Sequence, residues 1–183
     1  MLLLHICCGP CALYPLEQLK QRGYPVKGLF YNPNIHPYLE FKARIQALET
    51  VSKREKVEIL WVKDYGLEFF LEETLFQWEK PKRCERCYYM RLKKTVEVAL
   101  ELRAEAFSTT LLQSPFQFHE LIKEIGEELE DRYKITFFYE DWRRGYKEGK
   151  AKAMELGVYR QKYCGCLFSE KERYLPHRKE KIY

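Results

Sequence analysis

Short apolar runs alternate with segments of helical periodicity along the chain. An apolar run that ends in polar or turn-forming residues predicts a buried strand, and apolar residues recurring at intervals of three and four predict a helix. The expected strands cover residues 2–6, 26–31, 57–62, 106–112 and 135–139. The expected helices cover residues 10–22, 38–55, 84–103, 114–133 and 145–156, with an aromatic-rich helical insertion at 65–83. Strands that alternate with helices in this way predict an α/β fold built on a parallel sheet.

Two of the expected helices carry more specific signals. In residues 38–55, the apolar positions at helical spacing are Leu39, Ala43, Ala47, Leu48 and Val51. The helix at 114–133 has a candidate capping box, with Ser114 at the N-cap, Pro115 at the first helical position and Gln117 at the third.

The turns that follow the expected strands carry many of the chemically active side chains. Ligands of open α/β sheets bind beyond the carboxyl ends of the strands. The turns contain Cys7 and Cys8 after the first strand, Asn32-Pro33-Asn34 after the second, Gln113-Ser114-Pro115 after the fourth and Asp141 after the fifth. We therefore expect these groups to converge at one edge of the sheet.

Length and composition fit an ordinary folded domain. A chain of 183 residues is long enough to bury most of an apolar core, and we expect residues 1–183 to form one domain. The apolar run at residues 2–6 is too short for a membrane span or a secretory signal. We therefore expect a cytoplasmic protein with no membrane partner.

Positive charge is concentrated toward the C-terminus, in an expected basic helical segment. The formal net charge is +5; residues 142–183 carry twelve Lys or Arg against five acids, which gives this segment +7 and the rest of the chain −2. A basic segment favours a polyanionic partner, and RNA is the obvious one in the cytoplasm. On charge alone, a merely solvated tail explains the excess as well.

The seven cysteines fall into three short clusters. They are Cys7-Cys8-Gly9-Pro10-Cys11, Cys84-Glu85-Arg86-Cys87 and Cys164-Gly165-Cys166. An odd number of cysteines in a reducing compartment argues against a disulfide framework, and two Cys-x-x-Cys pairs favour a metal site. The start of the expected helix, together with Arg83 and Arg86, is expected to lower the pKa of Cys84 and Cys87.

The spacing of the thiols is compatible with an iron–sulfur cluster or with a structural zinc. An α/β domain of this size has its own core and does not need zinc to fold. Cysteines at the functional edge of a sheet also suit catalysis better than structural support. These arguments favour an iron–sulfur redox centre.

The remaining candidates are less specific. Cys164 and Cys166, with one glycine between them, can form a strained, easily reduced disulfide or supply ligands to a second metal. Asp141 offers a carboxylate beside arginines and aromatic residues that suit a nucleotide, although a polar turn explains the same composition. His36 is a weaker candidate as a ligand or acid, and His119 as an RNA contact. The loop after the first strand has a single glycine and no phosphate cradle, so ATP use is unsupported.

Five segments of the chain form a specific combination. They are His5–Cys11, Tyr31–Pro37, Cys84–Tyr88, Ser108–Pro115 and Tyr159–Cys166. In these segments, and over nearly its whole length, the chain resembles the epoxyqueuosine reductase QueH family. It departs from the usual family pattern at Gly9, where many relatives have Ala, and at Trp142, where Phe is usual.

The resemblance implies the last step of queuosine biosynthesis, a two-electron deoxygenation of epoxyqueuosine to queuosine in tRNA without cobalamin. The expected fold is similar to nucleotide-binding folds of the PP-loop or HUP type. The implied partners are the tRNA anticodon loop that carries epoxyqueuosine and an external electron donor. The implied cofactor is a [4Fe-4S] cluster ligated by Cys7, Cys8, Cys84 and Cys87, with Cys164 and Cys166 as a redox-active pair.

Several points stay open at this stage. Cys11 matches the family pattern and is a candidate ligand, but its role is unsettled. A second metal ion, iron, is a further candidate, and Asp141 is a candidate proton donor or ligand to it. Two alternative functions remain: an iron–sulfur tRNA sulfur-transfer enzyme that uses ATP, and a zinc-stabilised RNA-binding module without chemistry.

Overall fold

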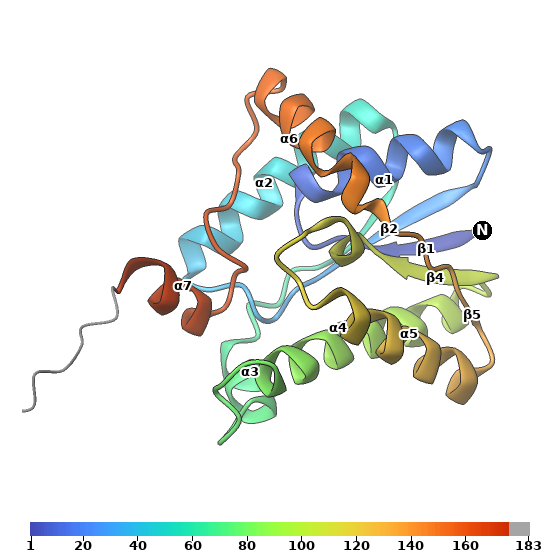
Figure 1. Cartoon of the computed structure of the whole chain (residues 1–183). Helices are drawn as coiled ribbons and strands as arrows, with labels where there is room; N and C mark the ends of the chain where they lie inside the picture. The colour runs from blue at the N-terminus through green and yellow to red at the C-terminus, as the bar shows by residue number, and fades with distance from the viewer. Residues whose placement is uncertain (176–183) are drawn as a thin grey trace, which may run out of the picture.

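The computed structural model describes residues 1–175 and has a five-stranded sheet at its centre (Figure 1). The strands are β1 (Leu2–His5), β2 (Val26–Tyr31), β3 (Ile59–Val62), β4 (Ala106–Thr109) and β5 (Thr136–Phe137). All neighbouring strands are parallel, and their order is β3-β2-β1-β4-β5. The expected parallel α/β fold is therefore confirmed.

Helices cover both faces of the sheet. The α-helices are α1 (Gly9–Gln21), α2 (Tyr38–Glu55), α3 (Leu67–Glu73), α4 (Lys82–Glu101), α5 (His119–Tyr133), α6 (Tyr146–Glu155) and α7 (Leu167–Tyr174). Helices α1, α2 and α6 pack together on one face, and α4 and α5 pack on the other (Figure 1). Two short 3₁₀ helices, η1 (Thr110–Gln113) and η2 (Trp142–Gly145), follow the last two strands.

Strand β1 lies in the middle of the sheet, and all four of its residues are buried. The chain builds β2 and β3 on one side of β1 and then crosses to the other side to build β4 and β5. The strand order thus reverses next to β1, and a crevice forms at the carboxyl ends of strands where the order reverses. The first cysteine pair follows β1 directly, so it lies at this crevice.

Several expected bounds differ from the structure, and three local expectations are wrong for a clear physical reason. Helix α5 begins at His119, because residues 114–117 form a turn in which the carbonyl of Ser114 accepts from the Gln117 amide at 3.3 Å. The fourth strand ends at Thr109, whose hydroxyl accepts from the Leu111 amide at 3.2 Å and starts η1. Leu39 is 75% exposed, since the buried stripe of α2 runs instead through two charged residues that are described below.

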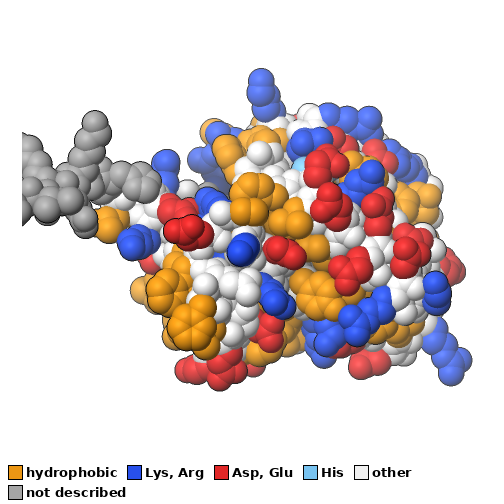
Figure 2. Space-filling view, turned by 60° about the horizontal axis from the view of Figure 1, so that its bottom comes forward, with side chains coloured by type: hydrophobic (Ala, Val, Ile, Leu, Met, Phe, Trp, Pro, Cys, Tyr) orange, Lys and Arg blue, Asp and Glu red, His pale blue; other side chains and the backbone are white. Residues whose placement is uncertain are grey.

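The insertion between β3 and α4 consists of α3 and an irregular segment. It is anchored through Phe70, which packs with Cys87, Met90 and Cys166 in a small apolar cluster. Figure 2 brings this side of the molecule forward and shows acidic and basic side chains mixed over it, with hydrophobic side chains at the lower left. The exposed hydrophobic residues of the insertion are Phe69, Leu71, Leu75, Phe76 and Trp78.

Helix α7 is the expected C-terminal helix, and it ends close to the limit of the described residues. The charged residues of the basic segment at positions 178–181 lie outside these residues. Within residues 1–175, no helix combines the length and the apolar character needed to cross a bilayer.

Candidate functional site

The loop that carries Cys7 and Cys8 is fixed by the strands on both sides of β1. The amide of Cys7 donates to Thr110 Oγ1 at 3.1 Å, and Asn32 Nδ2 donates to the carbonyl of Ile6 at 2.9 Å. Below the loop, the buried ring of His5 contacts Thr109 Oγ1 at 2.8 Å and the carbonyl of Tyr31 at 3.1 Å. The turns after β1, β2 and β4 therefore converge, as expected from the sequence.

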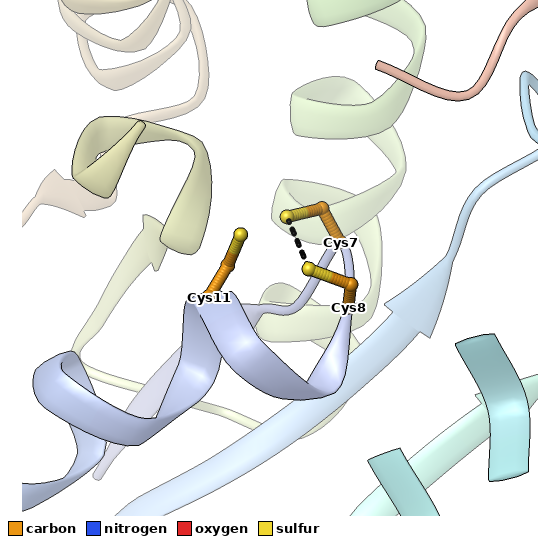
Figure 3. Close-up of side chains that lie close together, drawn as sticks. All are labelled: Cys7, Cys8 and Cys11. Atoms are coloured by element: carbon orange, nitrogen blue, oxygen red, sulfur yellow. Dashed lines mark hydrogen bonds between the residues drawn. The ribbon is translucent and has the colours of Figure 1, made fainter. Parts of the chain in front are cut away.

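Three thiols lie together at the start of α1 (Figure 3). Cys8 is the N-cap of α1, and Cys11 lies one turn later on the same face. The Sγ atoms of Cys7, Cys8 and Cys11 all lie within 4.8 Å of one another, and those of Cys7 and Cys8 are 3.8 Å apart. A Cβ at position 9 would lie 2.7 Å from the carbonyl oxygen of Ala47, so Gly9 allows this turn to pack directly against α2.

The three thiols share negative charge unequally. Hydrogen bonds from Cys11 and Cys8 hold the pKa of Cys7 well below the ordinary value, whereas the pKa of Cys8 is raised by burial. The pKa of Cys11 is raised by its hydrogen bonds to Cys7 and Cys8 and by burial. Three buried thiols this close together stabilise a thiolate on one of them. Sulfur donors grouped in this way are typical metal ligands, so the donor set fits a thiolate-bound metal.

A second group of thiols comes from α4 and from the segment before α7. Cys84 and Cys87 lie in the first two turns of α4, Cys166 is the N-cap of α7, and Cys87 and Cys166 share the apolar cluster around Phe70. All seven cysteines are free thiols. The expectation that the helix start lowers the pKa of Cys84 is wrong: burial and then the charge of Cys164 raise it to about 11.

The reason for this error is that burial outweighs the nearby positive charge. Arg83 does lower the pKa of Cys84, but less than burial raises it. Its guanidinium also forms an ion pair with Glu172 of α7. Burial likewise raises the pKa of Cys87.

Buried Arg91 lies between the two groups of thiols. Burial lowers its pKa, but the charges of Cys87, Cys164 and Cys7 together raise it above the ordinary value. Its Nε donates to the carbonyl of Cys87 at 2.9 Å, and its buried Nη2 has no hydrogen-bond partner. Within residues 1–175 it forms no ion pair with a carboxylate. This guanidinium is a fixed positive charge facing a site that gathers thiols.

The structure brings Cys7, Cys8 and Cys11 together, and within the described chain no other group of three potential ligands is so close. Cys84 and Cys87 do not belong to this group but lie beside Cys164 and Cys166, whose charges act on both of them. Arg91 is a neighbour of both groups, and so is Arg44, on which the charges of Cys8 and Cys164 act.

A cavity of about 820 Å³ opens above the thiols. Its walls include Cys7, Cys11 and Cys164, together with Arg44, Arg91, Gln113, Gln117, Tyr146 and Gln161. Gln161 Nε2 donates to Cys8 Sγ at 3.0 Å and to Cys11 Sγ at 3.4 Å, and Gln117 Nε2 lies 3.6 Å from Cys164 Sγ. Amide side chains thus orient thiols from both groups toward one space.

The segment that carries Cys164 and Cys166 is held by hydrogen bonds to its backbone. Arg44 of α2 donates to the carbonyls of Cys164 at 2.8 Å and Tyr163 at 3.0 Å. The amide of His36 donates to the carbonyl of Gly165 at 2.8 Å, and Gly165 has a φ of +138° that favours glycine. The conformation of this loop is therefore set by α2 and by the turn after β2.

The other candidate residues lie away from the thiols or are enclosed. Asp141 is not part of the cavity wall; it pairs with Arg143 at 2.6 Å, and hydrogen bonds from Arg143 lower its pKa to about 2. The carboxyl group of Asp141 therefore carries no proton near neutral pH, so the structure does not support a role for Asp141 as a proton donor. His36 is fully buried, and His119 is buried with Nε2 3.0 Å from the hydroxyl of Tyr139.

Three residues that shape this site were not predicted as site residues from the sequence: Arg44, Arg91 and Gln161. The two arginines lie on the buried faces of α2 and α4, among the apolar residues. A charged residue at an apolar position of a helical pattern is the signal that could have identified them. Gln161 has no such pattern and was noted only as part of the segment Tyr159–Cys166, because its place beside Cys8 depends on an irregular segment.

Fold and site define a class: a parallel α/β domain with a thiol-rich cavity at the carboxyl edge of its sheet, where three cysteines could hold a metal ion. The family model described as epoxyqueuosine reductase QueH matches residues 2–172. The chain belongs to this family.

Similar proteins include the epoxyqueuosine reductase QueH of Thermotoga maritima, which is 37% identical over 96% of this chain and 93% of its own length. That of Dehalococcoides mccartyi is 34% identical over 94% of each chain. That of Helicobacter pylori is 36% identical over 93% of this chain but only 49% of its own, longer sequence. The similarity to the first two thus extends over nearly the full length of both chains.

Proposed function

We propose that this protein reduces epoxyqueuosine to queuosine in tRNA, with a [4Fe-4S] cluster and without cobalamin. The proposed cluster ligands are Cys7, Cys8, Cys84 and Cys87, and the proposed redox-active pair is Cys164 and Cys166. The observation that carries the proposal is that Cys7 and Cys164 line the same cavity, so one substrate can reach both groups of thiols. Free thiols throughout the chain fit a reducing compartment such as the cytoplasm.

The residues present fit an iron–sulfur group. Thiolates are its usual ligands, and two of the proposed four, Cys7 and Cys8, have Sγ atoms 3.8 Å apart at the start of α1. The buried, unpartnered Nη2 of Arg91 faces this region and would balance the negative charge of thiolate-bound iron. When bound, the cluster would supply electrons one at a time.

The reaction removes the epoxide oxygen as water, which takes two electrons and two protons and leaves a carbon–carbon double bond. Two thiols that form a disulfide release two electrons and two protons. Oxidation of Cys164 and Cys166 to a disulfide therefore balances the reaction, and an external donor returns them to thiols.

Cys164 is suited to hold the proton that the leaving oxygen needs. Burial raises the pKa of its thiol, so it keeps its proton at neutral pH. Gln117 Nε2 lies 3.6 Å from its Sγ and fixes its direction. Arg91 and Arg44 on the cavity wall provide positive charge where the oxygen becomes negative.

The test begins with protein purified without oxygen. The wild type should be brown, bind about four irons per chain and convert epoxyqueuosine in tRNA without ATP. Cys84→Ser should lose both iron and conversion, and the matched control Cys11→Ser should keep its iron. A Cys84→Ser protein that keeps iron and activity would overturn the ligand set, and loss of iron in Cys11→Ser alone would assign the iron to the three thiols at α1.

The same measurements separate the alternative functions. Conversion without ATP excludes the sulfur-transfer enzyme. Iron in place of zinc, together with turnover, excludes the RNA-binding module without chemistry. Replacing both Cys164 and Cys166 with Ser should leave the iron in place and stop conversion, and an active double variant would refute the redox pair.

A further inference from the structure

Two aromatic side chains lie at the mouth of the cavity. Phe116, in the turn before α5, and Tyr146, at the start of α6, both belong to the cavity wall. Phe116 is 79% exposed, and its ring centroid is 5.8 Å from that of Tyr146 at an angle of 82°. An isolated exposed phenylalanine needs no explanation. An exposed phenylalanine on the wall of a cavity that leads to reactive thiols does need one, because an exposed aromatic ring can stack with a flat ligand.

The aromatic pair lies close to thiols of both groups. Tyr146 lines the cavity together with Cys7 and Cys11 of the first group of thiols. Ser114 Oγ accepts from the amide of Phe116 at 3.3 Å, which holds the turn. The next residue, Gln117, contacts Cys164 Sγ. A group seated on these rings is therefore directed toward thiols from both groups.

The charge of the cavity identifies the class of ligand. Its basic residues are Arg44, Lys80, Arg91, Lys150, Arg160, Lys162 and Arg173. Glu172 is the one acid among the lining residues, and it is paired with Lys80 at 2.7 Å and with Arg83. Over the side formed by α3, α4 and α5, by contrast, acidic and basic side chains are mixed (Figure 2). Aromatic faces surrounded by basic residues are the features that bind single-stranded nucleic acid.

We propose that Phe116 and Tyr146 form a stacking platform for a nucleobase of the tRNA anticodon loop. Lys150, Arg160 and Lys162 lie exposed on the same cavity and contact the backbone phosphates on either side of that base. This inference rests on the proposed function and deepens it, because it names the residues that take the RNA. A protein partner, such as an electron donor, is the alternative occupant.

The first test measures binding of an unmodified anticodon stem-loop RNA to the iron-loaded protein. Stacking contributes about 1–3 kcal/mol per base, so Phe116→Ala should weaken binding about 5- to 150-fold. Phe116→Trp should retain the affinity, and its indole fluorescence should be quenched by the RNA. The matched control is Phe76→Ala, because Phe76 is 83% exposed but lies outside the cavity. It should bind like the wild type.

A second variant tests the phosphate contacts. Arg160→Gln should weaken binding and reduce the slope of log affinity against log salt by about 0.7 for one lost phosphate contact on single-stranded RNA. Phe116→Ala should leave this slope unchanged, since a stacked ring contacts no phosphate. Equal slopes for Arg160→Gln and the wild type would refute the proposed contact between Arg160 and a backbone phosphate.

The outcomes separate this proposal from the proposed function. If the wild type converts epoxyqueuosine and Phe116→Ala binds RNA as tightly as the wild type, the platform is refuted and the function stands. If Phe116→Ala keeps RNA affinity but loses conversion, a protein electron donor occupies this surface instead. If the wild type binds RNA through Phe116 but converts no epoxyqueuosine, the platform stands and the function fails.

Discussion

Nη1 of Arg44 donates a hydrogen bond of 2.8 Å to the backbone carbonyl of Cys164, a residue 120 positions later in the chain. Arg44 is only 2% exposed, and its Nε is held by Glu40 at 2.8 Å. The carboxylate of Glu40 also accepts a hydrogen bond from the hydroxyl of Tyr159. The ion pair of Glu40 and Arg44 on the buried side of α2 thus fixes the position of Cys164 in the cavity wall.

The first prediction concerns Arg44→Lys. Lysine keeps the charge but lacks the planar fork that reaches two carbonyls, so the loop at Cys164 should lose its position. Hydrogen bonds to charged groups are worth about 1.5–3 kcal/mol, so conversion should fall about 10- to 150-fold. Iron content should not change, and the rate at which a thiol reagent labels Cys164 should rise.

The matched control for this prediction is Arg54→Lys. Arg54 lies on the same helix, but its side chain is half exposed and is 3.7 Å from Glu55. It should behave as the wild type in conversion and in thiol labelling. Unchanged labelling and conversion in Arg44→Lys would show that the loop holds its position without the guanidinium.

The second prediction concerns Gly165→Ala. At a φ of +138°, an added Cβ would lie 3.2 Å from Asn34 Nδ2 and 3.3 Å from Arg44 Nη1. Backbone strain of this kind costs about 1–3 kcal/mol, and the loop should relieve it by moving away from Arg44. Conversion should fall while the helical signal in circular dichroism is retained. Gly23→Ala is the control, because Gly23 also has a positive φ but no atom lies within 4 Å of the added Cβ; equal losses in both variants would contradict the prediction.

The third prediction concerns Arg91→Met, which removes the positive charge between the two groups of thiols. Groups that surround metal ligands typically change metal affinity about 10- to 100-fold when they are replaced. Iron should therefore be lost to a chelator about 10- to 100-fold faster, as followed by absorbance. Lys93→Met, on the same helix and partly exposed, should lose iron at the wild-type rate. Identical rates for Arg91→Met and the wild type would show that its charge does not stabilise the bound iron.

The fourth prediction is a pH dependence of stability caused by His36. Its ring is fully buried, both ring nitrogens lack hydrogen-bond partners, and burial lowers its pKa from 6.5 to about 4. Above pH 6.5 the ring is neutral in the folded and unfolded chains, so it does not change the free energy of unfolding with pH there. Between pH 6.5 and about 4 only the unfolded chain takes up the proton, so stability falls, by about 2–3 kcal/mol at pH 4.5.

The measurement is urea unfolding of the metal-free protein at pH 7 and pH 4.5. His36→Phe should remove the part of the stability loss between pH 7 and pH 4.5 that is due to His36. Phenylalanine can take this place because the ring of His36 packs between Tyr65 and Phe70 without any hydrogen bond. The share due to His5, whose pKa is also lowered to about 4 by burial, should remain. An equal loss of stability in the wild type and in His36→Phe would contradict the assignment.

The fold could be predicted from the sequence because its signals are local and repeated. Strand β2 and helix α2 begin and end at the expected residues. The spacing of Cys8 and Cys11 also predicted that their thiols would share a face of α1. Periodicity, however, treats every apolar residue as buried, and Leu39 is exposed whereas Arg44 is not.

The failures have one physical cause, which is that tertiary contacts override local preference. Ser114 and Gln117 have the residue types of a capping box, but the side chain of Gln117 contacts Cys164 and the hydroxyl of Tyr88. Cys84 is at a helix start, but burial dominates its pKa. The position of Cys84 and Cys87 beside Cys164 and Cys166 depends on how α7 packs against α4, which spacing alone does not give.

The thiols occupy the starts of three helices that are far apart in the chain: Cys8 caps α1, Cys84 is in the first turn of α4 and Cys166 caps α7. With the proposed ligands, a bound cluster acts as a cross-link between α1 and α4, and its binding free energy adds to the stability of the folded chain. Oxygen that destroys the cluster would therefore also release this cross-link, so exposure to oxygen would lower the stability of the folded chain as well as stop conversion.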